Sequence, residues 1–173
     1  MEQKILKQFN RIVDFLEKQP EKIELIVIGG LARYFYNLPR HTIDIDAEIK
    51  CSSSVYEKLY NFCQKANILI NIGENISGWG IIPLPEGYRK RATTIKETSN
   101  LSIKVLSPID YVFSKLARGT EQDIHDALDV CRHFKISQDA IQKHLSLVKL
   151  PLDPESRFFI ERLEIFKEKL TSK

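Results

Sequence analysis

The sequence predicts an α+β fold: a mixed β-sheet flanked by helices in residues 1–106, with a helical part in residues 107–173 packed on it. Two observations predict this division. Before Ser107, short runs of β-branched and apolar residues alternate with amphipathic segments, and Gly, Pro and Ser separate them. After Ser107, apolar residues recur every three or four positions. The 173 residues suffice for one domain, or for one domain with a small helical addition.

The chain is expected to open with a helix, a strand and a glycine turn. Residues 3–18 place their apolar side chains on one helical stripe. Residues 24–28 are mostly β-branched or apolar, which predicts a buried strand. Gly29 and Gly30 carry no Cβ, so the backbone can turn tightly there and approach a ligand closely. A short helix over residues 31–37 would then offer N–H groups and a partial positive charge to a phosphate.

A second strand is expected to carry a pair of carboxylates. Residues 42–49 alternate polar with apolar, so Asp44 and Asp46 share one face of the strand, roughly 6 to 7 Å apart at Cα. Carboxylates this close repel one another unless a cation lies between them. Oxygen ligands favour Mg²⁺ or Mn²⁺. Glu48 continues the same face and is expected at the exposed end of the strand.

The remainder of the first part is broken by Gly and Pro between residues 73 and 91. We expect a helix over residues 52–66, capped by Ser52, Ser53 or Ser54, and then a strand over residues 68–72. Residues 79–82 are a candidate short strand, and residues 91–96 and 101–106 are expected to form a hairpin.

The second part is expected to contain four helices. Ser107 caps the first, with Pro108 in its first turn. Ser137 caps the third, and the apolar residues of the last repeat at helical spacing. The first is expected to begin at residue 107 and to bury Tyr111, Val112 and Leu116, and the others are expected over residues 121–134, 137–147 and 153–170.

Composition limits the classes of function. Lys and Arg exceed Asp and Glu by 26 − 23 = +3, which suits an anionic ligand such as a nucleotide but is too small to indicate DNA binding. No apolar run approaches the roughly 18 residues that span a membrane, and the N-terminus lacks a signal-peptide core. The three cysteines have no metal-ligand spacing, so a cytoplasmic location is expected.

The glycine turn and the aspartate pair form a recognisable block. Gly29 and Gly30 begin a G-G-x-A turn, and an R-x-T-x-D-I-D segment that starts at Arg40 follows it. This block resembles the signature of the nucleotidyltransferase superfamily, an hG[GS] turn followed by h[DE]h[DE]h. With Arg40 and Thr42, it resembles the branch of abortive-infection type toxins of toxin–antitoxin pairs and related uncharacterised bacterial proteins.

A second block is similar to the late motif of that branch, in which a lysine precedes an R/K-D-x-x-D element. Lys115, Asp123 and Asp126 match the motif, while Gln122 stands where a basic residue is usual. The resemblance implies that Lys115 steadies a triphosphate and that Asp123 and Asp126 orient Lys115 or the nucleotide. The alternative for the two aspartates is a favourable interaction with the helix dipole. Arg118 shares a helical face with Lys115.

The resemblance implies a nucleotidyltransferase-like fold and transfer of an NMP from an NTP to an acceptor hydroxyl. It implies Mg²⁺ or Mn²⁺ at Asp44 and Asp46, with Lys115 as a further catalytic residue. The acceptor would be a tRNA end, a protein side chain or a small molecule, among which the sequence does not choose, and a cognate antitoxin would be a partner. Nucleotide contacts would come from Gly29, Gly30, Arg40, Thr42, Arg118, Asp123 and Asp126.

One departure from the pattern concerns a third carboxylate, which related enzymes usually carry on a later strand. Asn71 occupies the position where it would be sought, and Glu74 and Glu97 are possible substitutes.

Two other functions therefore stay open: a catalytically degenerate fold that serves as a binding or regulatory module, and a small-molecule, antibiotic-type nucleotidyltransferase. The basic cluster of residues 88–91 would meet an acidic substrate such as a tRNA end, or form a solvated loop.

Overall fold

The computed structural model describes residues 2–39 and 42–171, and the chain divides into two compact units. The first unit comprises residues 1–75 and 92–106. The second comprises residues 76–91 and 107–173. Each unit is described by itself below.

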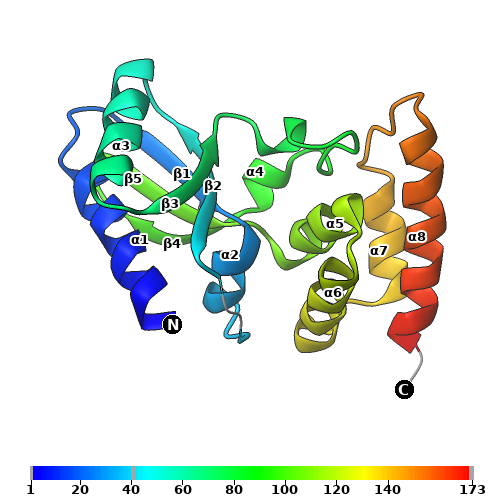
Figure 1. Cartoon of the computed structure of the whole chain (residues 1–173). Helices are drawn as coiled ribbons and strands as arrows, with labels where there is room; N and C mark the ends of the chain where they lie inside the picture. The colour runs from blue at the N-terminus through cyan, green and yellow to red at the C-terminus, as the bar shows by residue number, and fades with distance from the viewer. Residues whose placement is uncertain (1, 40–41, 172–173) are drawn as a thin grey trace. The chain divides into compact units, whose positions relative to one another are not determined.

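The first unit is built on a five-stranded mixed sheet with strand order β3-β2-β1-β5-β4 (Figure 1). β1 pairs antiparallel with β2 and parallel with β5, β2 pairs parallel with β3, and β4 pairs antiparallel with β5. The predicted mixed sheet flanked by helices is confirmed. The strands are β1 (Ile23–Val27), β2 (Asp44–Lys50), β3 (Leu69–Gly73), β4 (Thr93–Glu97) and β5 (Leu101–Val105).

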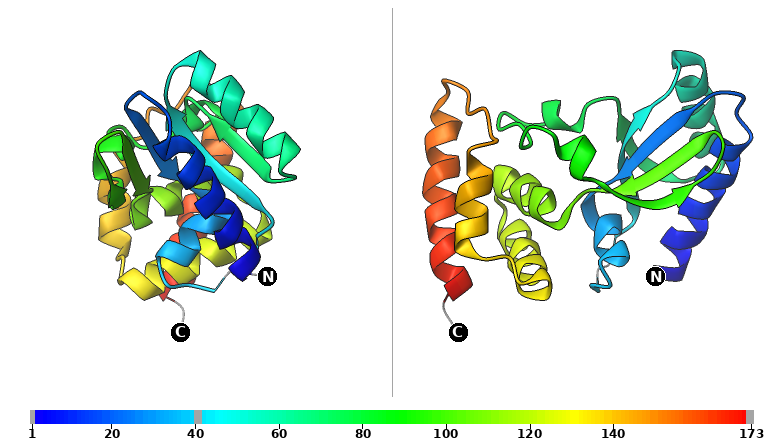
Figure 2. Two further views of the ribbon diagram at one scale, coloured as in Figure 1. Left: turned by 90° about the vertical axis from the view of Figure 1, so that its left-hand side faces the viewer. Right: turned by 180° about the vertical axis from the view of Figure 1, so that it is seen from behind.

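Two helices cover one face of this sheet, as Figure 1 and the left view of Figure 2 show. They are α1 (Glu2–Glu17) and α3 (Ser53–Lys65), and Ser52 caps α3. Alternate strand residues such as Leu25, Ile45 and Ile103 point into the core that the two helices close. The expected apolar stripe of α1 is buried in this core: Ile5, Phe9, Ile12, Val13 and Leu16.

The opposite face of the sheet is mostly polar, with Ile26 and Leu69 as apolar members, and we call it the polar face. The alternation along each strand and the register between strands place these residues on it: Glu24, Asp44, Asp46, Glu48, Lys50, Asn71, Ser102 and Lys104. Glu48 was expected at an exposed strand end, but only 5% of it is exposed. It lies inside the sheet beside Ile26 of β1 and Gly73 of β3, so paired strands flank it on both sides.

The second unit is helical. Three of its helices begin at side-chain caps, because Ser107, Thr120 and Ser137 each accept a hydrogen bond from a backbone N–H in the first turn that follows. Buried Phe159, Leu163 and Phe166 form the inner stripe of the last helix. The elements are η1 (Ile76–Gly78), α4 (Tyr88–Arg91), α5 (Pro108–Arg118), α6 (Glu121–Phe134), α7 (Gln138–Leu145) and α8 (Pro154–Thr171).

The segment before β4 differs from the sequence expectation. Residues 79–82 form bends, so the candidate strand there is wrong, and residues 88–91 form the short helix α4. Contacts with distant residues hold the end of this segment. Arg91 donates two hydrogen bonds to the fully buried carboxylate of Asp110, at 2.7 and 2.9 Å, and also contacts the carbonyl of Pro85. His144 on α7 lies 2.8 Å from the same carboxylate.

A side chain of α8 caps the C-terminal end of α5. Gly119 adopts φ +71° and ends the helix in the left-handed region. The Arg162 guanidinium lies against it and donates hydrogen bonds to the carbonyls of Leu116, at 2.6 Å, and Ala117, at 3.2 Å. These carbonyls belong to the last turn of α5, where helical partners are lacking.

Candidate nucleotide and metal site

Gly29 and Asp46 lie in direct contact at the end of β1. Gly29 has φ +61°, which starts α2 (Gly29–Phe35) immediately after the strand. A Cβ placed on Gly29 would overlap the carboxylate of Asp46 and would lie 2.9 Å from the Cβ of that residue. Only glycine suits the position, because it needs both the positive φ and the space. The turn therefore holds the Asp46 carboxylate against the first residues of α2.

Gly30 makes the corresponding contact with Thr42. A Cβ on Gly30 would lie 2.6 Å from the Cβ of Thr42 and 2.7 Å from its hydroxyl oxygen. That hydroxyl donates a 2.7 Å hydrogen bond to Oδ1 of Asp44. The two glycines thus each accommodate one residue of the extended segment, and Thr42 orients the first carboxylate.

The aspartate pair suits a divalent cation. Asp44 and Asp46 are both half-buried and share the polar face at the start of β2. No side chain caps α2, since Ile28 occupies its N-cap. Among the described residues no three His, Cys, Asp or Glu side chains form a group that could hold a metal ion. Two carboxylates fit Mg²⁺ or Mn²⁺ nevertheless, because Mg²⁺ commonly takes one or two carboxylates and completes its shell with substrate phosphates and water.

The register shows where the third-carboxylate candidates lie. Asn71 pairs directly with Asp46 across β2 and β3, so an exposed amide stands beside the carboxylate pair. Glu74 follows the end of β3. Glu97 lies on β4, at the other edge of the sheet, and accepts a 2.6 Å hydrogen bond from Ser102. Glu97 is therefore remote from β2 within the sheet.

Lys115 lies in a buried ion-pair cluster of the second unit. Only 3% of the residue is exposed, and its ammonium nitrogen is 3.1 Å from Asp123 and 3.1 Å from Asp126. The ammonium also lies 5.3 Å from the ring centre of Tyr111. Because both aspartates are buried as well, the lysine compensates two carboxylates at once.

Asp123 also takes part in the cap at the start of α6. Its carboxylate accepts hydrogen bonds from Thr120, at 2.8 Å to the hydroxyl, and from the Nε of Arg118, at 3.0 Å. Burial alone would raise the pKa of Asp123, but the bonds from Arg118 and Thr120 and the charge of Lys115 together hold that pKa well below its usual range. Asp123 thus both orients Lys115 and forms a capping box with Thr120, which joins the two interpretations considered from the sequence.

Comparison with known proteins gives the family. A protein-family model described as a nucleotidyltransferase of unknown function (DUF6036) matches residues 3–151. The chain belongs to this family. The match confirms the predicted relationship to nucleotidyltransferases, while the assignment to the toxin branch stays a prediction. No curated protein matches the chain.

The residues predicted for nucleotidyl transfer form two groups, both within the span of the family match. Gly29, Gly30, Thr42, Asp44 and Asp46 meet in the first unit. Arg40 lies outside the described residues. The second group, in the second unit, consists of Lys115, Arg118, Asp123 and Asp126.

Sequence reasoning missed a further buried cluster in the second unit. Asp110 is fully buried, with Arg91, Ser107 and His144 around its carboxylate. Burial raises the pKa of Asp110, and the hydrogen bonds from His144, Arg91 and Ser107 outweigh it and lower that pKa. The available signal was Ser-Pro-x-Asp at a helix start, which predicts a cap but not its distant partners. Arg91, expected to meet a substrate or solvent, is instead held inside the unit.

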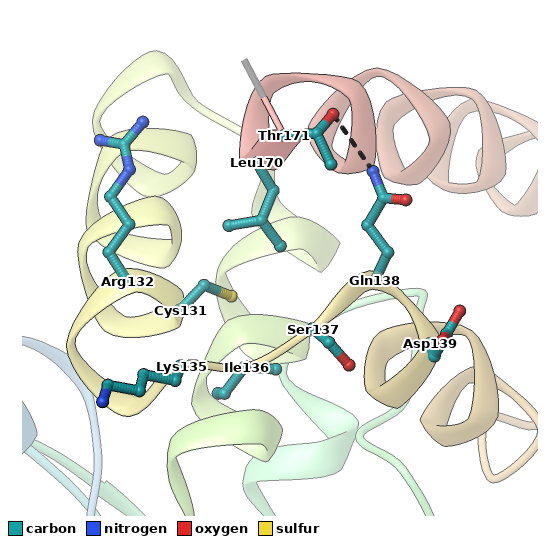
Figure 3. A pocket seen from close by; sticks show the side chains of 9 residues that line it. All are labelled: Cys131, Arg132, Lys135, Ile136, Ser137, Gln138, Asp139, Leu170 and Thr171. Carbon is teal, nitrogen blue, oxygen red and sulfur yellow. Dashed lines mark hydrogen bonds between the residues drawn. The ribbon is translucent and has the colours of Figure 1, made fainter. Parts of the chain in front are cut away.

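A pocket of about 470 Å³ lies between the ends of α6 and α8 and the start of α7 (Figure 3). It contains none of the predicted site residues. Gln138 crosses it to the hydroxyl of Thr171, 3.5 Å away. Cys131 is the only thiol in its lining, and burial raises the pKa of that thiol to about 12. The thiol is therefore protonated at neutral pH and unsuited to act as a nucleophile.

No described helix combines the length and the apolar character needed to cross a bilayer. All three cysteines are free thiols.

Proposed function

We propose that this chain is a metal-dependent nucleotidyltransferase that moves an NMP from an NTP to an acceptor hydroxyl, on a tRNA or a protein. The observation that carries the proposal is the double glycine contact. Gly29 fits against Asp46, and Gly30 fits against Thr42, which in turn orients Asp44. A strand-to-helix turn alone would not require two adjacent positions without a Cβ, each facing one residue of a carboxylate strand.

In this proposal the first unit supplies the metal and phosphate contacts. Asp44 and Asp46 would hold Mg²⁺ or Mn²⁺, which offsets negative charge on the triphosphate and on the leaving pyrophosphate. Backbone N–H groups near Gly30 would contact the phosphates, because the start of α2 has no side-chain cap. The acceptor oxygen would attack the α-phosphorus, forming a new P–O bond as the bond to pyrophosphate breaks. Position and charge would supply most of the rate enhancement.

The Lys115 cluster has a positioning role in this proposal. Lys115 is tied to Asp123 and Asp126, whereas 64% of the Arg118 side chain is exposed. Lys115 as a direct phosphate ligand would require one of its two aspartate contacts to open. A toxin role, with a cognate antitoxin as partner, follows only from the sequence resemblance and belongs to the same proposal.

Calorimetric titration of each NTP, with and without Mg²⁺, tests the proposal. The wild type is compared with Asp44→Ala/Asp46→Ala and with Asp14→Ala, which removes an exposed carboxylate of α1. We expect Mg²⁺-dependent binding in the wild type and in Asp14→Ala, and none in the double variant. Equal binding by all three proteins would place the site elsewhere.

A binding module without catalysis is the second candidate. It is favoured by Asn71 beside Asp46 and by the lack of a third metal-binding side chain among the described residues. Such a module would bind an NTP without needing Mg²⁺ and would release no pyrophosphate with any acceptor. Pyrophosphate release in the presence of cell RNA or protein distinguishes the two candidates.

A further inference from the structure

A pocket of the first unit, of about 680 Å³, lies on the same polar face as the aspartate pair. The strand residues Glu24, Lys50, Ser102 and Lys104 line it, together with the turn between β4 and β5. The register pairs Glu24 with both Lys50 and Ser102, which places these side chains on one face. The family match assigns no role to this pocket.

The pocket lies within a short distance of the proposed metal site. Asp46 lies on β2 and Lys104 on β5, two strand spacings apart with β1 between them. Asp46 lies beside Ile28 of the chain that continues β1, and Lys104 lies beside Ile26 of β1, so the two residues are also offset by two positions along the strands. Strand spacing and rise put their Cα atoms about 12 Å apart. A ligand that extends over the polar face could therefore contact both places.

The lining is rich in hydrogen-bond donors. Lys22, Lys50 and Lys104 line the pocket, along with serine and threonine hydroxyls and the Asn100 amide. The apolar lining residues are Ile23 and Leu101, which are each 1% exposed and offer no surface to a ligand.

The two carboxylates of the pocket are already engaged by its own side chains. Glu24 lies 3.1 Å from Lys104 and 3.7 Å from Lys50. The hydrogen bond from Lys104 lowers the pKa of Glu24. Glu97 accepts a hydrogen bond from Ser102 at 2.6 Å. The carboxylates thus hold the donors in place, and the pocket carries three lysines against two carboxylates, a net charge of 3 − 2 = +1.

We propose that this pocket binds the sugar–phosphate backbone of a single-stranded RNA, and that this RNA carries the acceptor hydroxyl. The inference rests on the proposed function, because it identifies the acceptor of that reaction. Lysine, serine, threonine and asparagine are the side chains that contact phosphate and sugar oxygens in nucleic-acid complexes. Hydroxyl and amide groups that both donate and accept can also bind the ribose 2′-OH.

A protein acceptor fits the pocket less well. Peptide-binding grooves use exposed apolar or aromatic pockets, or an unpaired strand edge, to hold side chains in register. The apolar residues of this pocket are covered, and its strands β1 and β5 are paired on both sides, so only the edge strand β4, which contributes Thr94 and Glu97, has a free side for a peptide strand. The exposed groups of the pocket are therefore charges and hydroxyls, which suit a sugar–phosphate backbone better than a peptide.

Fluorescence anisotropy tests the inference with a fluorescein-labelled single-stranded RNA of mixed sequence, without NTP or metal. The test variant is Lys22→Gln/Lys50→Gln, since both side chains are exposed and their removal spares the core. The matched control is Lys58→Gln, an exposed lysine of α3, the helix that covers the other face. We expect the variant to bind RNA about tenfold more weakly at low salt, with a salt slope smaller by about 1.4, and the control to match the wild type.

The outcomes separate this inference from the proposed function. The lysine double variant should keep Mg²⁺-dependent NTP binding, and Asp44→Ala/Asp46→Ala should lose it without weaker RNA binding. The inference is overturned if RNA affinity is equal in both lysine variants, or if a polyglutamate peptide binds with the same dependence on Lys22 and Lys50. A wild type that binds RNA but shows no Mg²⁺-dependent NTP binding would instead count against the proposed function alone.

Discussion

Gly29 lies directly against the carboxylate of Asp46, so the glycine turn and the aspartate strand form one structural unit. Gly29 cannot gain a Cβ without displacing the Asp46 side chain. This contact joins the first residue of α2 to β2, the strand that follows that helix in the chain and pairs with β1.

Gly29→Ala should disrupt the site more than the fold. The new Cβ must displace the Asp46 carboxylate, and a non-glycine residue at φ +61° costs about 1 kcal/mol in free energy of unfolding. We expect a modest fall in the midpoint of thermal unfolding and loss of Mg²⁺-dependent NTP binding. Gly80→Ala is the control, because its Cβ would meet nothing closer than a carbonyl 4.0 Å away. Retained NTP binding in Gly29→Ala would contradict the proposed position of Asp46.

Lys115→Ala should destabilise the second unit strongly. The change leaves the buried carboxylates of Asp123 and Asp126 without their shared cation, which typically costs 3–5 kcal/mol, so we expect a loss of about that size. Urea unfolding followed by circular dichroism measures it. Lys149→Ala removes an exposed lysine paired with Glu86 and should cost about 0–1 kcal/mol. Similar losses for the two variants would show that the Lys115 cluster is not buried.

Acid should weaken the wild type through Asp123. The pKa of Asp123 is lower in the folded chain than the value of about 4 expected when unfolded, so its contribution to stability is present above pH 4 and is lost as the pH falls further. We expect the free energy of unfolding to drop more steeply below pH 4 in the wild type than in Asp123→Asn. Asp14→Asn, at an exposed position of α1, is the matched control. Parallel curves for wild type and Asp123→Asn would refute the prediction.

The three thiols should resist modification in the folded protein. Burial raises the pKa of Cys51 and Cys63 to about 11 and that of Cys131 to about 12. At pH 8 about one thiol in a thousand or fewer is then a thiolate, the form that reacts. We expect slow reaction with a disulfide reagent at pH 8 and rapid reaction of all three thiols in guanidinium chloride. Fast labelling before unfolding would mean that a thiol is more accessible than the structure shows.

The sequence was most informative where local patterns decide the structure. Ser107 and Ser137 cap helices as their types predict, and the glycine turn and the alternation around Asp44 and Asp46 appear as expected. These features depend on neighbouring residues alone, since a cap, a turn and a strand face are set within a few positions.

Features that depend on distant partners could not be derived in this way. Residues 79–82 form bends where local composition suggested a strand, and the contact that holds the end of their segment, between Arg91 and Asp110, joins positions nineteen apart. Helical spacing placed Lys115 and Arg118 on one face, but it gave no sign that Lys115 is buried while Arg118 is largely exposed. Glu48 looked like a strand end because nothing local marks the paired strands on both of its sides.

The cap that Arg162 provides for α5 has a consequence for how far the protein can be shortened. The family match stops at residue 151, whereas α8 begins at Pro154. A fragment cut at the end of the match would release the last carbonyls of α5 and uncover Phe113, whose ring centre lies 6.3 Å from that of Phe159. The stretch that the family model matches is thus shorter than the stretch whose side chains cap α5 and cover Phe113.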